Sequence, residues 1–344
     1  MSSSSAPDMA FVDPDALRVL ITGFGPFAKY NENPSWLAVK PLNNTIIYTD
    51  PPAEPILHVE HDAIITDDME EMLRPKPVHI TTLQVPVTYK AVLSAVPGFH
   101  ARPPVLPESN DPDTVLAPSP NGYDFILHVG VAGRGPLRLE KISHKNGFRM
   151  KDADGEYAPI VPLLPKETPK DPLNPTDTDM DRMADMLGLS SPMTIPGITI
   201  PGQPPILGSG MSVPGQARAE GGTDGTDHPP NRGFGKGYET FADELTTSID
   251  VAKLLHYLKE NGVEQVYSSM DAGHYLCDFM LYCSLAEAKR LAARQEKLQE
   301  RTVPPKCTPV LFMHCGPVDQ PLSTAEVTEA IKKVVSWVCG RLHT

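Results

Sequence analysis

The stretch Asp124–Val131 reads DFILHVGV and is the clearest indication of the fold in this sequence. It is rich in Val, Ile and Leu, and it lacks the strict alternation of apolar and polar residues that a half-exposed strand shows. Such a run is typical of a parallel strand that is covered on both faces. Four further runs share this character, and they are Arg18–Thr22, Ile80–Val85, Gln265–Ser269 and Pro309–Met313.

Helical patterns lie between and after these runs. An apolar stripe at helical spacing extends over Val251–Leu258 and stops before Gly262. The capping box Ser323–Glu326 opens a second helix, and a third is predicted over about Ala272–Leu298. Strands that alternate with helices predict an α/β fold with a single doubly wound, mostly parallel sheet, flanked by helices on both faces. Ligands bind at the carboxyl ends of the strands in such sheets.

The prolines determine the predicted domain organisation. The 344 residues include 38 prolines, about twice the usual share, and they gather in inserts at about 43–77, 97–120 and 157–237. The last insert is rich in Pro, Gly and Asp without periodicity, which predicts a disordered or loosely packed segment. We therefore expect a flexible N-terminus over residues 1–16 and a single domain over residues 17–344 that carries the three inserts.

Charge and hydrophobicity exclude several classes of partner. The formal net charge is −13, and an acidic chain repels phosphate backbones and anionic lipids, so we expect neither nucleic acid nor membrane as a partner. No apolar run reaches the length of a membrane span, and the N-terminus does not read as a signal peptide. The expected compartment is the cytosol. The sequence does not indicate an oligomeric state.

Five cysteines lie in the last quarter of the chain. Their odd number and the absence of a CxxC pair argue against a disulfide framework and against a zinc site. Cys277 belongs to Ser268–Phe279, SSMDAGHYLCDF, in which a strand ends, a small-residue turn follows and a helix begins. Backbone N–H groups and the helix dipole there favour negative charge, so we expect a stabilised thiolate that acts as a nucleophile. A thiol buried beneath the sheet is the alternative.

Two further residues could complete a hydrolytic site. His314 ends an apolar strand just before a Gly-Pro break, at the carboxyl edge where Cys277 is also expected, and it could accept the thiol proton. Glu140 follows a glycine-rich turn, and an acid beside the histidine would fix its tautomer. The alternatives are an ordinary strand-end histidine and a solvated glutamate that pairs with Lys141 or Arg138.

An aromatic loop follows the first predicted strand directly. Thr22–Phe27 reads TGFGPF, and its Gly-Pro step forbids a helix of the dinucleotide-binding kind. The segment is therefore a fixed loop that presents Phe24 and Phe27. The two rings could form the wall of a small, flat pocket, or they could fill the edge of the core.

These segments, taken together and in this order, resemble the pyroglutamyl peptidase I (pyrrolidone carboxyl peptidase) family. The matching stretches are TGFGPF…NPSW at 22–36, HVGVAG…LEK at 128–141, SMDAGHYLCDF at 269–279 and LFMH at 311–314. The resemblance extends from Leu17 to the end of the chain and is interrupted by the proline-rich inserts. It implies a cysteine exopeptidase, an omega peptidase, that removes N-terminal pyroglutamate from peptides through a thioester. It implies no metal ion and no organic cofactor.

The resemblance also implies catalytic roles. Cys277 matches the nucleophile of the family, His314 matches the base and Glu140 matches the third catalytic residue. The nucleophile is followed by Asp278, where many relatives have asparagine.

The resemblance implies a substrate pocket as well. Phe24 and Phe27 match the aromatic wall of a lactam pocket, and Asn33 matches a motif asparagine that we expect to support the loop. Backbone N–H groups near the nucleophile are the expected oxyanion donors, with Arg149 as a further candidate. Lys145 occupies the place of a family asparagine, which puts the assignment of Arg149 in doubt.

Two other functions are compatible with the same sequence. The chain could be a noncatalytic family member that binds a partner through its acidic, proline-rich insert. It could also be a cysteine hydrolase that acts on other N-acyl or lactam amides.

Overall fold

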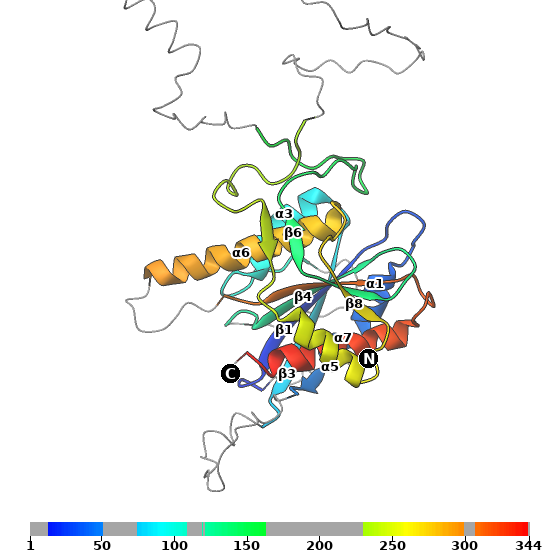
Figure 1. The fold of residues 1–344 in the computed structure, drawn as a ribbon. Coiled ribbons are helices and arrows are strands. Elements are labelled where there is room, and N and C mark those ends of the chain that lie inside the picture. The colour runs from blue at the N-terminus through cyan, green and yellow to red at the C-terminus, as the bar shows by residue number, and fades with distance from the viewer. Residues whose placement is uncertain are drawn as a thin grey trace, which may run out of the picture. The chain divides into compact units, whose positions relative to one another are not determined.

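A seven-stranded sheet organises the part of the chain that the computed structural model describes, which is residues 13–50, 74–108, 119, 121–162, 230–298 and 307–342 (Figure 1). In spatial order its strands are β2 (Ile46–Tyr48), β3 (Pro77–Val85), β1 (Leu17–Phe24), β4 (Phe125–Val131), β9 (Val310–Cys315), β5 (Leu137–Glu140) and β8 (Val266–Ser269). Strands β3, β1, β4 and β9 are parallel, whereas β2 pairs antiparallel with β3. Strand β5 is antiparallel to β9 and parallel to β8.

Helices cover both faces of this sheet (Figure 1). One face packs against α1 (Pro34–Val39), α5 (Val251–Glu260) and α7 (Thr324–Cys339), and the short 3₁₀ helix η1 (Lys40–Leu42) follows α1. The other face packs against α3 (Tyr89–Phe99) and α6 (Leu276–Leu298). A separate two-stranded pair, β6 (Ile142–His144) and β7 (Glu244–Thr246), lies against α6. The predicted doubly wound, mostly parallel α/β fold is confirmed.

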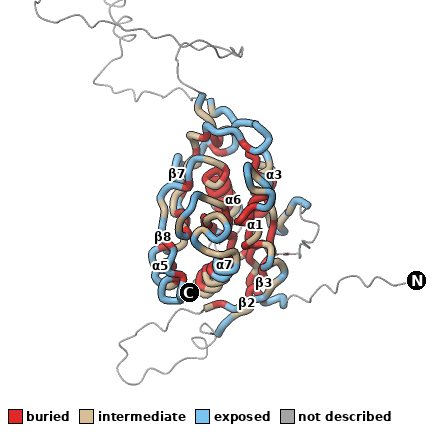
Figure 2. Tube along the Cα trace, turned by 90° about the vertical axis from the view of Figure 1, so that its right-hand side faces the viewer, coloured by how far each residue is buried: buried red, intermediate tan, exposed pale blue. Residues whose placement is uncertain are grey.

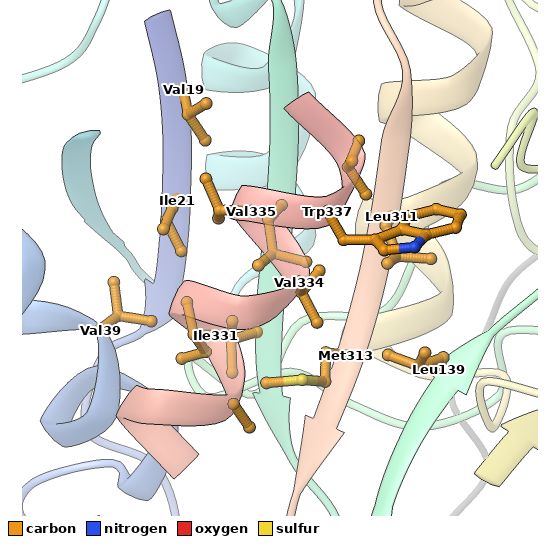
Figure 3. Close-up of a cluster of buried hydrophobic side chains, with 14 of the residues drawn as sticks. Val19, Ile21, Val39, Leu139, Leu311, Met313, Ile331, Val334, Val335 and Trp337 are labelled. Atoms are coloured by element: carbon orange, nitrogen blue, oxygen red, sulfur yellow. The ribbon is translucent and has the colours of Figure 1, made fainter. Parts of the chain in front are cut away.

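The two faces of the sheet carry separate hydrophobic cores. On the first face the apolar stripe of α7 packs against residues of β1, β5 and β9. Figure 3 shows Ile331, Val334, Val335 and Trp337 of the helix beside Val19, Ile21, Leu139, Leu311 and Met313 of the strands. The second core joins α3 and α6 to the alternate residues of the same strands. Buried residues accordingly follow the strands and the inner sides of the helices (Figure 2). Within the described residues, no helix is long and apolar enough to cross a membrane.

Helix ends follow local backbone chemistry. The predicted capping box of α7 is present, because the Ser323 side chain accepts from the backbone N–H of Glu326 and the Glu326 carboxylate accepts from Ser323. Helix α6 begins at Leu276 and not near Ala272 as the sequence predicted. Gly273 and His274 have φ values of 94° and 43°, and residues in the left-handed region cannot continue a right-handed helix.

The three predicted inserts consist mostly of residues outside the described part of the chain. Residues 1–12, 51–73, 109–118 and 163–229 are not described, so the flexible N-terminus, the single-domain organisation and the disorder of 157–237 stay predictions. The described edges of the inserts add three findings. Residues 46–48 form β2, Pro97 lies inside α3, and Phe234 stacks on Phe279 with ring centroids 4.1 Å apart.

Two buried histidines lie beneath α3 and α6. Nδ1 of His128 on β4 is 2.7 Å from Oγ1 of Thr22, its register partner on β1. At the end of α3, Nε2 of His100 is 2.9 Å from Oγ of Ser284. Burial is the main cause that lowers the pKa of both imidazoles to about 3. Both rings are therefore neutral in the folded protein at pH 7.

We expect these histidines to make the protein sensitive to acid. The unfolded chain has histidine pKa values of about 6.5, so between roughly pH 6.5 and pH 3 it binds more protons than the folded chain. The free energy of unfolding therefore decreases as the pH is lowered through this range. Each buried histidine contributes a slope of about 1.4 kcal/mol per pH unit in this window. Urea unfolding of His128→Asn between about pH 4.5 and 7 should show a slope reduced by that amount.

The matched control is His256→Asn, because the side chain of His256 is 75% exposed. Its slope should equal that of the unchanged protein. An unchanged slope in His128→Asn would contradict the assignment of a neutral buried imidazole at that position.

Candidate active site

A buried carboxylate and a buried imidazole meet across β5 and β9. Arg138 pairs with His314, and Glu140 pairs with Phe312, so Glu140 and His314 are diagonal neighbours on one face of an antiparallel pair. The distance from His314 Nδ1 to Glu140 Oε1 is 2.6 Å. The Glu140 side chain is 0% exposed and the His314 side chain 4%. The contact fixes the ring so that Nε2 is the nitrogen left for proton transfer.

This burial settles one alternative left open by the sequence. Glu140 is not a solvated surface acid, although Nε of Arg138 lies 3.7 Å from the same Oε1 atom. Its second oxygen, Oε2, is buried and has no hydrogen-bond partner among the described residues.

Cys277 reaches the same face of the sheet from the first turn of α6. A Cβ atom added to Gly130 of β4 would lie 3.0 Å from the Cys277 sulfur and 2.7 Å from Cζ of Phe312. Gly130 is the register partner of His314 on the neighbouring strand. Any larger residue at position 130 would therefore crowd the sulfur. The sulfur lies next to β9, the strand that carries the imidazole of His314.

The route by which these residues converge differs from the sequence argument. Cys277 and His314 lie at the carboxyl edge of β4 and β9, as expected, but β8, the strand before Cys277, runs antiparallel to β9 together with β5. The last residue of β8, Ser269, pairs with Glu140, two register steps away from the level of His314. The loop of residues 270–275 then leads to α6, which begins over Gly130. Mixed strand direction and this loop bring the three residues together.

The structure does not give Cys277 a stabilised thiolate. Burial of the sulfur, and after it the charge of Glu140, raises the pKa of the Cys277 thiol above its ordinary value, while Arg138 lowers it by less. The first-turn position is as expected, but burial is the largest cause acting on the thiol. A thiol whose pKa is raised in this way needs a base for its chemistry.

An apolar pocket of about 330 Å³ opens beside Cys277. Phe24 and Phe27 line it, as expected, and so does Tyr275 from the loop before α6. The ring centroids of Phe27 and Tyr275 are 5.7 Å apart. The cavity is therefore an aromatic slot with the sulfur at its inner end.

Hydrogen bonds hold the aromatic loop in place. Asn33 is 2% exposed; its Nδ2 donates to the Gly25 carbonyl at 3.1 Å, and its Oδ1 accepts from the backbone N–H of Ser35 at 3.1 Å. The Ser35 hydroxyl in turn accepts from the N–H of Phe24. A Cβ atom on Gly23 would come within 2.9 Å of the Trp36 Cα, so the loop and α1 require a glycine there.

Two residues differ from the site that the sequence predicted. Arg149 is exposed and is not among the residues that line the pocket. Tyr275 belongs to the cysteine motif but was not predicted from the sequence as a pocket residue, although it supplies a wall of the slot. Its position two residues before the cysteine, at the start of a helix, was the available signal.

Comparisons with known proteins agree with this geometry. No protein-family model matches the chain. Pyroglutamyl-peptidase 1 of Mus musculus is 20% identical over 326 residues, which are 94% of this chain and 91% of the mouse protein. Pyroglutamyl-peptidase 1 of Homo sapiens is 24% identical over 135 residues, 39% of this chain and 43% of the human protein. The crystal structure of Bacillus amyloliquefaciens pyroglutamyl peptidase I superposes with a TM-score of 0.51 at 16% identity, covering 95% of this chain and 98% of that one.

The chain is similar to pyroglutamyl-peptidase 1 proteins over nearly its whole length, and it shares the fold of a pyroglutamyl peptidase I. Both the match to the mouse protein and the superposition cover nearly the whole chain. The fold neighbour shares the α/β architecture, and residues from three of the four motifs that carried the resemblance line one slot in this chain. The fourth motif ends at His314, the register partner of Gly130.

We predict that Gly130→Ala damages this site directly. The added methyl group overlaps the Phe312 ring and the Cys277 sulfur, and overpacking of this kind costs about 1–3 kcal/mol. Guanidinium unfolding should report that loss, and iodoacetamide should modify Cys277 at a changed rate. The matched control is Gly133→Ala, since a Cβ atom there meets nothing within 4 Å. Equal stability of the two variants would contradict the predicted overlap.

Proposed function

We propose that this chain is a cysteine exopeptidase that hydrolytically removes N-terminal pyroglutamate from peptides. The supporting observation is that Cys277 lines the aromatic slot and also lies against Gly130, beside the strand that holds the His314–Glu140 pair. Nucleophile, base and pocket therefore share one location. The names of the mouse, rat and human relatives support the same activity.

The slot suits the pyroglutamyl ring. That ring is flat and uncharged, with one N–H group and one C=O group, so the faces of Phe24, Phe27 and Tyr275 can cover it. A free α-amino group would lose its hydration in this apolar setting without a described anionic partner among the lining residues. Peptides with an ordinary N-terminus are therefore excluded by desolvation.

His314 activates the nucleophile. Because Nδ1 is held by Glu140, Nε2 takes the proton of the Cys277 thiol while the sulfur attacks the pyroglutamyl carbonyl carbon. The imidazolium formed is stabilised by the buried carboxylate. The raised pKa of the thiol makes proton transfer accompany attack and not precede it.

Collapse of the tetrahedral intermediate completes the first half of the reaction. The C–N bond breaks, the imidazolium protonates the departing amine, and a thioester joins the pyroglutamyl group to Cys277. Backbone N–H groups in the first turn of α6 are the proposed oxyanion donors, because they lack carbonyl partners within the helix. Water, deprotonated by His314, then hydrolyses the thioester and restores the thiol.

The same proposal includes a setting for the enzyme. Its partners are peptides with an N-terminal pyroglutamate, and the mechanism uses neither nucleic acid nor membrane. All five cysteines are free, which suits a reducing compartment, and we place the protein in the cytoplasm.

A pyroglutamyl-coumarin amide tests the activity. We expect turnover that Cys277→Ser reduces to background, because a serine hydroxyl is a poor nucleophile in this setting. The control is Cys307→Ser, which changes the exposed cysteine and should keep full activity. Absence of turnover by the folded, reduced protein would instead favour the noncatalytic, partner-binding function.

A panel of amides tests the substrate class. Removal of the lactam ring, with other N-acyl groups in its place, should lower kcat/KM by more than about tenfold, since the slot then loses its flat occupant. Equal rates for acetyl and pyroglutamyl amides would favour a general N-acyl hydrolase.

Glu140→Gln tests the buried pair. We expect kcat to fall by about 10²–10⁴-fold with little change in KM, because the amide keeps the shape but not the charge that stabilises imidazolium. Glu287→Gln is the control, since Glu287 is also a buried carboxylate but bonds to Tyr238 and Arg290. A similar loss of kcat in both variants would mean that Glu140 acts only through stability.

A further inference from the structure

A second cluster of ionisable side chains lies next to the nucleophile. His144 ends β6, His274 precedes α6, and Asp278 follows Cys277 in the first turn of α6. Each offers one ligand atom, and the three atoms lie within 4.8 Å of one another. The sequence analysis noted Asp278 as a departure from the family pattern but assigned it no role.

The ligand atoms have the spacing of a small tetrahedral metal site. His144 Nδ1 is 3.0 Å from Asp278 Oδ2, and His274 Nδ1 is 3.5 Å from the same oxygen. Zinc bonds of about 2.0–2.2 Å in tetrahedral geometry separate neighbouring ligand atoms by roughly 3.3 Å. The two distances to Asp278 Oδ2 are close to this value, and all three atoms lie within 4.8 Å of one another, so small rotations of the imidazoles could bring them around a single ion.

The fold holds these side chains in the required orientation. Asp278 is 0% exposed, and its other oxygen, Oδ1, accepts from the backbone N–H of His144 at 2.9 Å. That bond fixes the carboxylate and leaves Oδ2 directed at the two rings. The left-handed backbone of His274 turns its ring toward the same oxygen, and the two imidazole centroids are 4.4 Å apart.

The site is also accessible from solvent. The side chains of His144 and His274 are 21% and 45% exposed, whereas the carboxylate lies beneath them. Gly147 lies beside His274, and a Cβ atom there would come within 3.3 Å of Nδ1. Absence of that side chain leaves the ring nitrogen open, so an ion could enter and keep a water molecule as its fourth ligand.

We propose that His144, His274 and Asp278 form a binding site for a divalent transition-metal ion of the zinc class. Two imidazole nitrogens and one carboxylate oxygen are a donor set that suits Zn²⁺ and Co²⁺ and suits Mg²⁺ or Ca²⁺ poorly. The ion would tie β6 to the start of α6, one residue from Cys277. The sequence argument against zinc concerned cysteine spacing, and this site uses none of the cysteines.

A network of hydrogen bonds without metal is the competing explanation for the same contacts. In it, His144 Nδ1 donates to Asp278 Oδ2, and His274 adds a longer contact. Burial raises the pKa of Asp278, and the contacts with His144 oppose that rise. The two explanations differ in one measurable property, which is saturable binding of a transition metal.

The test uses the full chain with Cys277→Ser, so that metal held by the proposed catalytic thiol does not contribute. Chelator-treated protein is titrated with Co²⁺ and then with competing Zn²⁺, while absorption and Tm are recorded. We expect one equivalent to bind, a cobalt spectrum without a thiolate charge-transfer band, and a Tm that rises with Zn²⁺. His274→Ala and Asp278→Asn should each weaken binding by at least about tenfold.

The control variant is His256→Ala, because His256 also faces a carboxylate, with Nε2 3.1 Å from Oε1 of Glu260, but belongs to no cluster of three possible ligands among the described residues. It should bind as tightly as the parent. Failure of Zn²⁺ and Co²⁺ to bind below millimolar concentration, or unchanged affinity in His274→Ala, would overturn the proposal. Because His274 is largely exposed, that variant decides the outcome even if Asp278→Asn does not fold. The measurement uses no peptidase activity, so it stands apart from the proposed function.

Discussion

The active site depends on one contact between two side chains that are both removed from water, the carboxylate of Glu140 and the imidazole of His314. A buried ionised carboxylate costs several kcal/mol unless a partner compensates it. The pairing of β5 with β9 supplies that partner, because antiparallel register makes the two residues diagonal neighbours. A β5 strand parallel to β9 would not give this register. The direction of a four-residue strand therefore determines whether the chain holds a base.

The sequence was sufficient for the architecture and for the selection of residues. Long apolar runs such as Phe125–Val131 are buried on both faces, so composition alone identified them, and the capping box fixed the start of α7. The aromatic loop was recognisable because Gly-Pro steps and paired phenylalanines leave few conformations. The family resemblance supplied the roles, and the structure places Cys277, Phe24, Phe27 and Asn33 on one pocket.

The remaining features depend on information that local sequence does not carry. Strand β5 contains only four residues, and its charged members Arg138 and Glu140 hide its strand character. Its direction follows from tertiary pairing, so the sequence did not show that Cys277 reaches the carboxyl edge of β1, β4 and β9 through a loop after an antiparallel strand. The protonation of Cys277 was misjudged for a similar reason. Helix position predicts a stabilised thiolate, but burial, the largest cause of the raised pKa of the thiol, depends on packing against segments distant in the sequence.

The bare backbone of Gly130 has a consequence for oxidative damage. On the sheet side, a methyl group at position 130 would lie only 3.0 Å from the Cys277 sulfur and 2.7 Å from Cζ of Phe312. Oxygen atoms added to the sulfur by peroxide thus have no room in that direction and must extend into the aromatic slot. A sulfinic acid would both remove the reactive electron pair and occupy the substrate's place, and any molecule lodged in the slot would shield the sulfur from the oxidant.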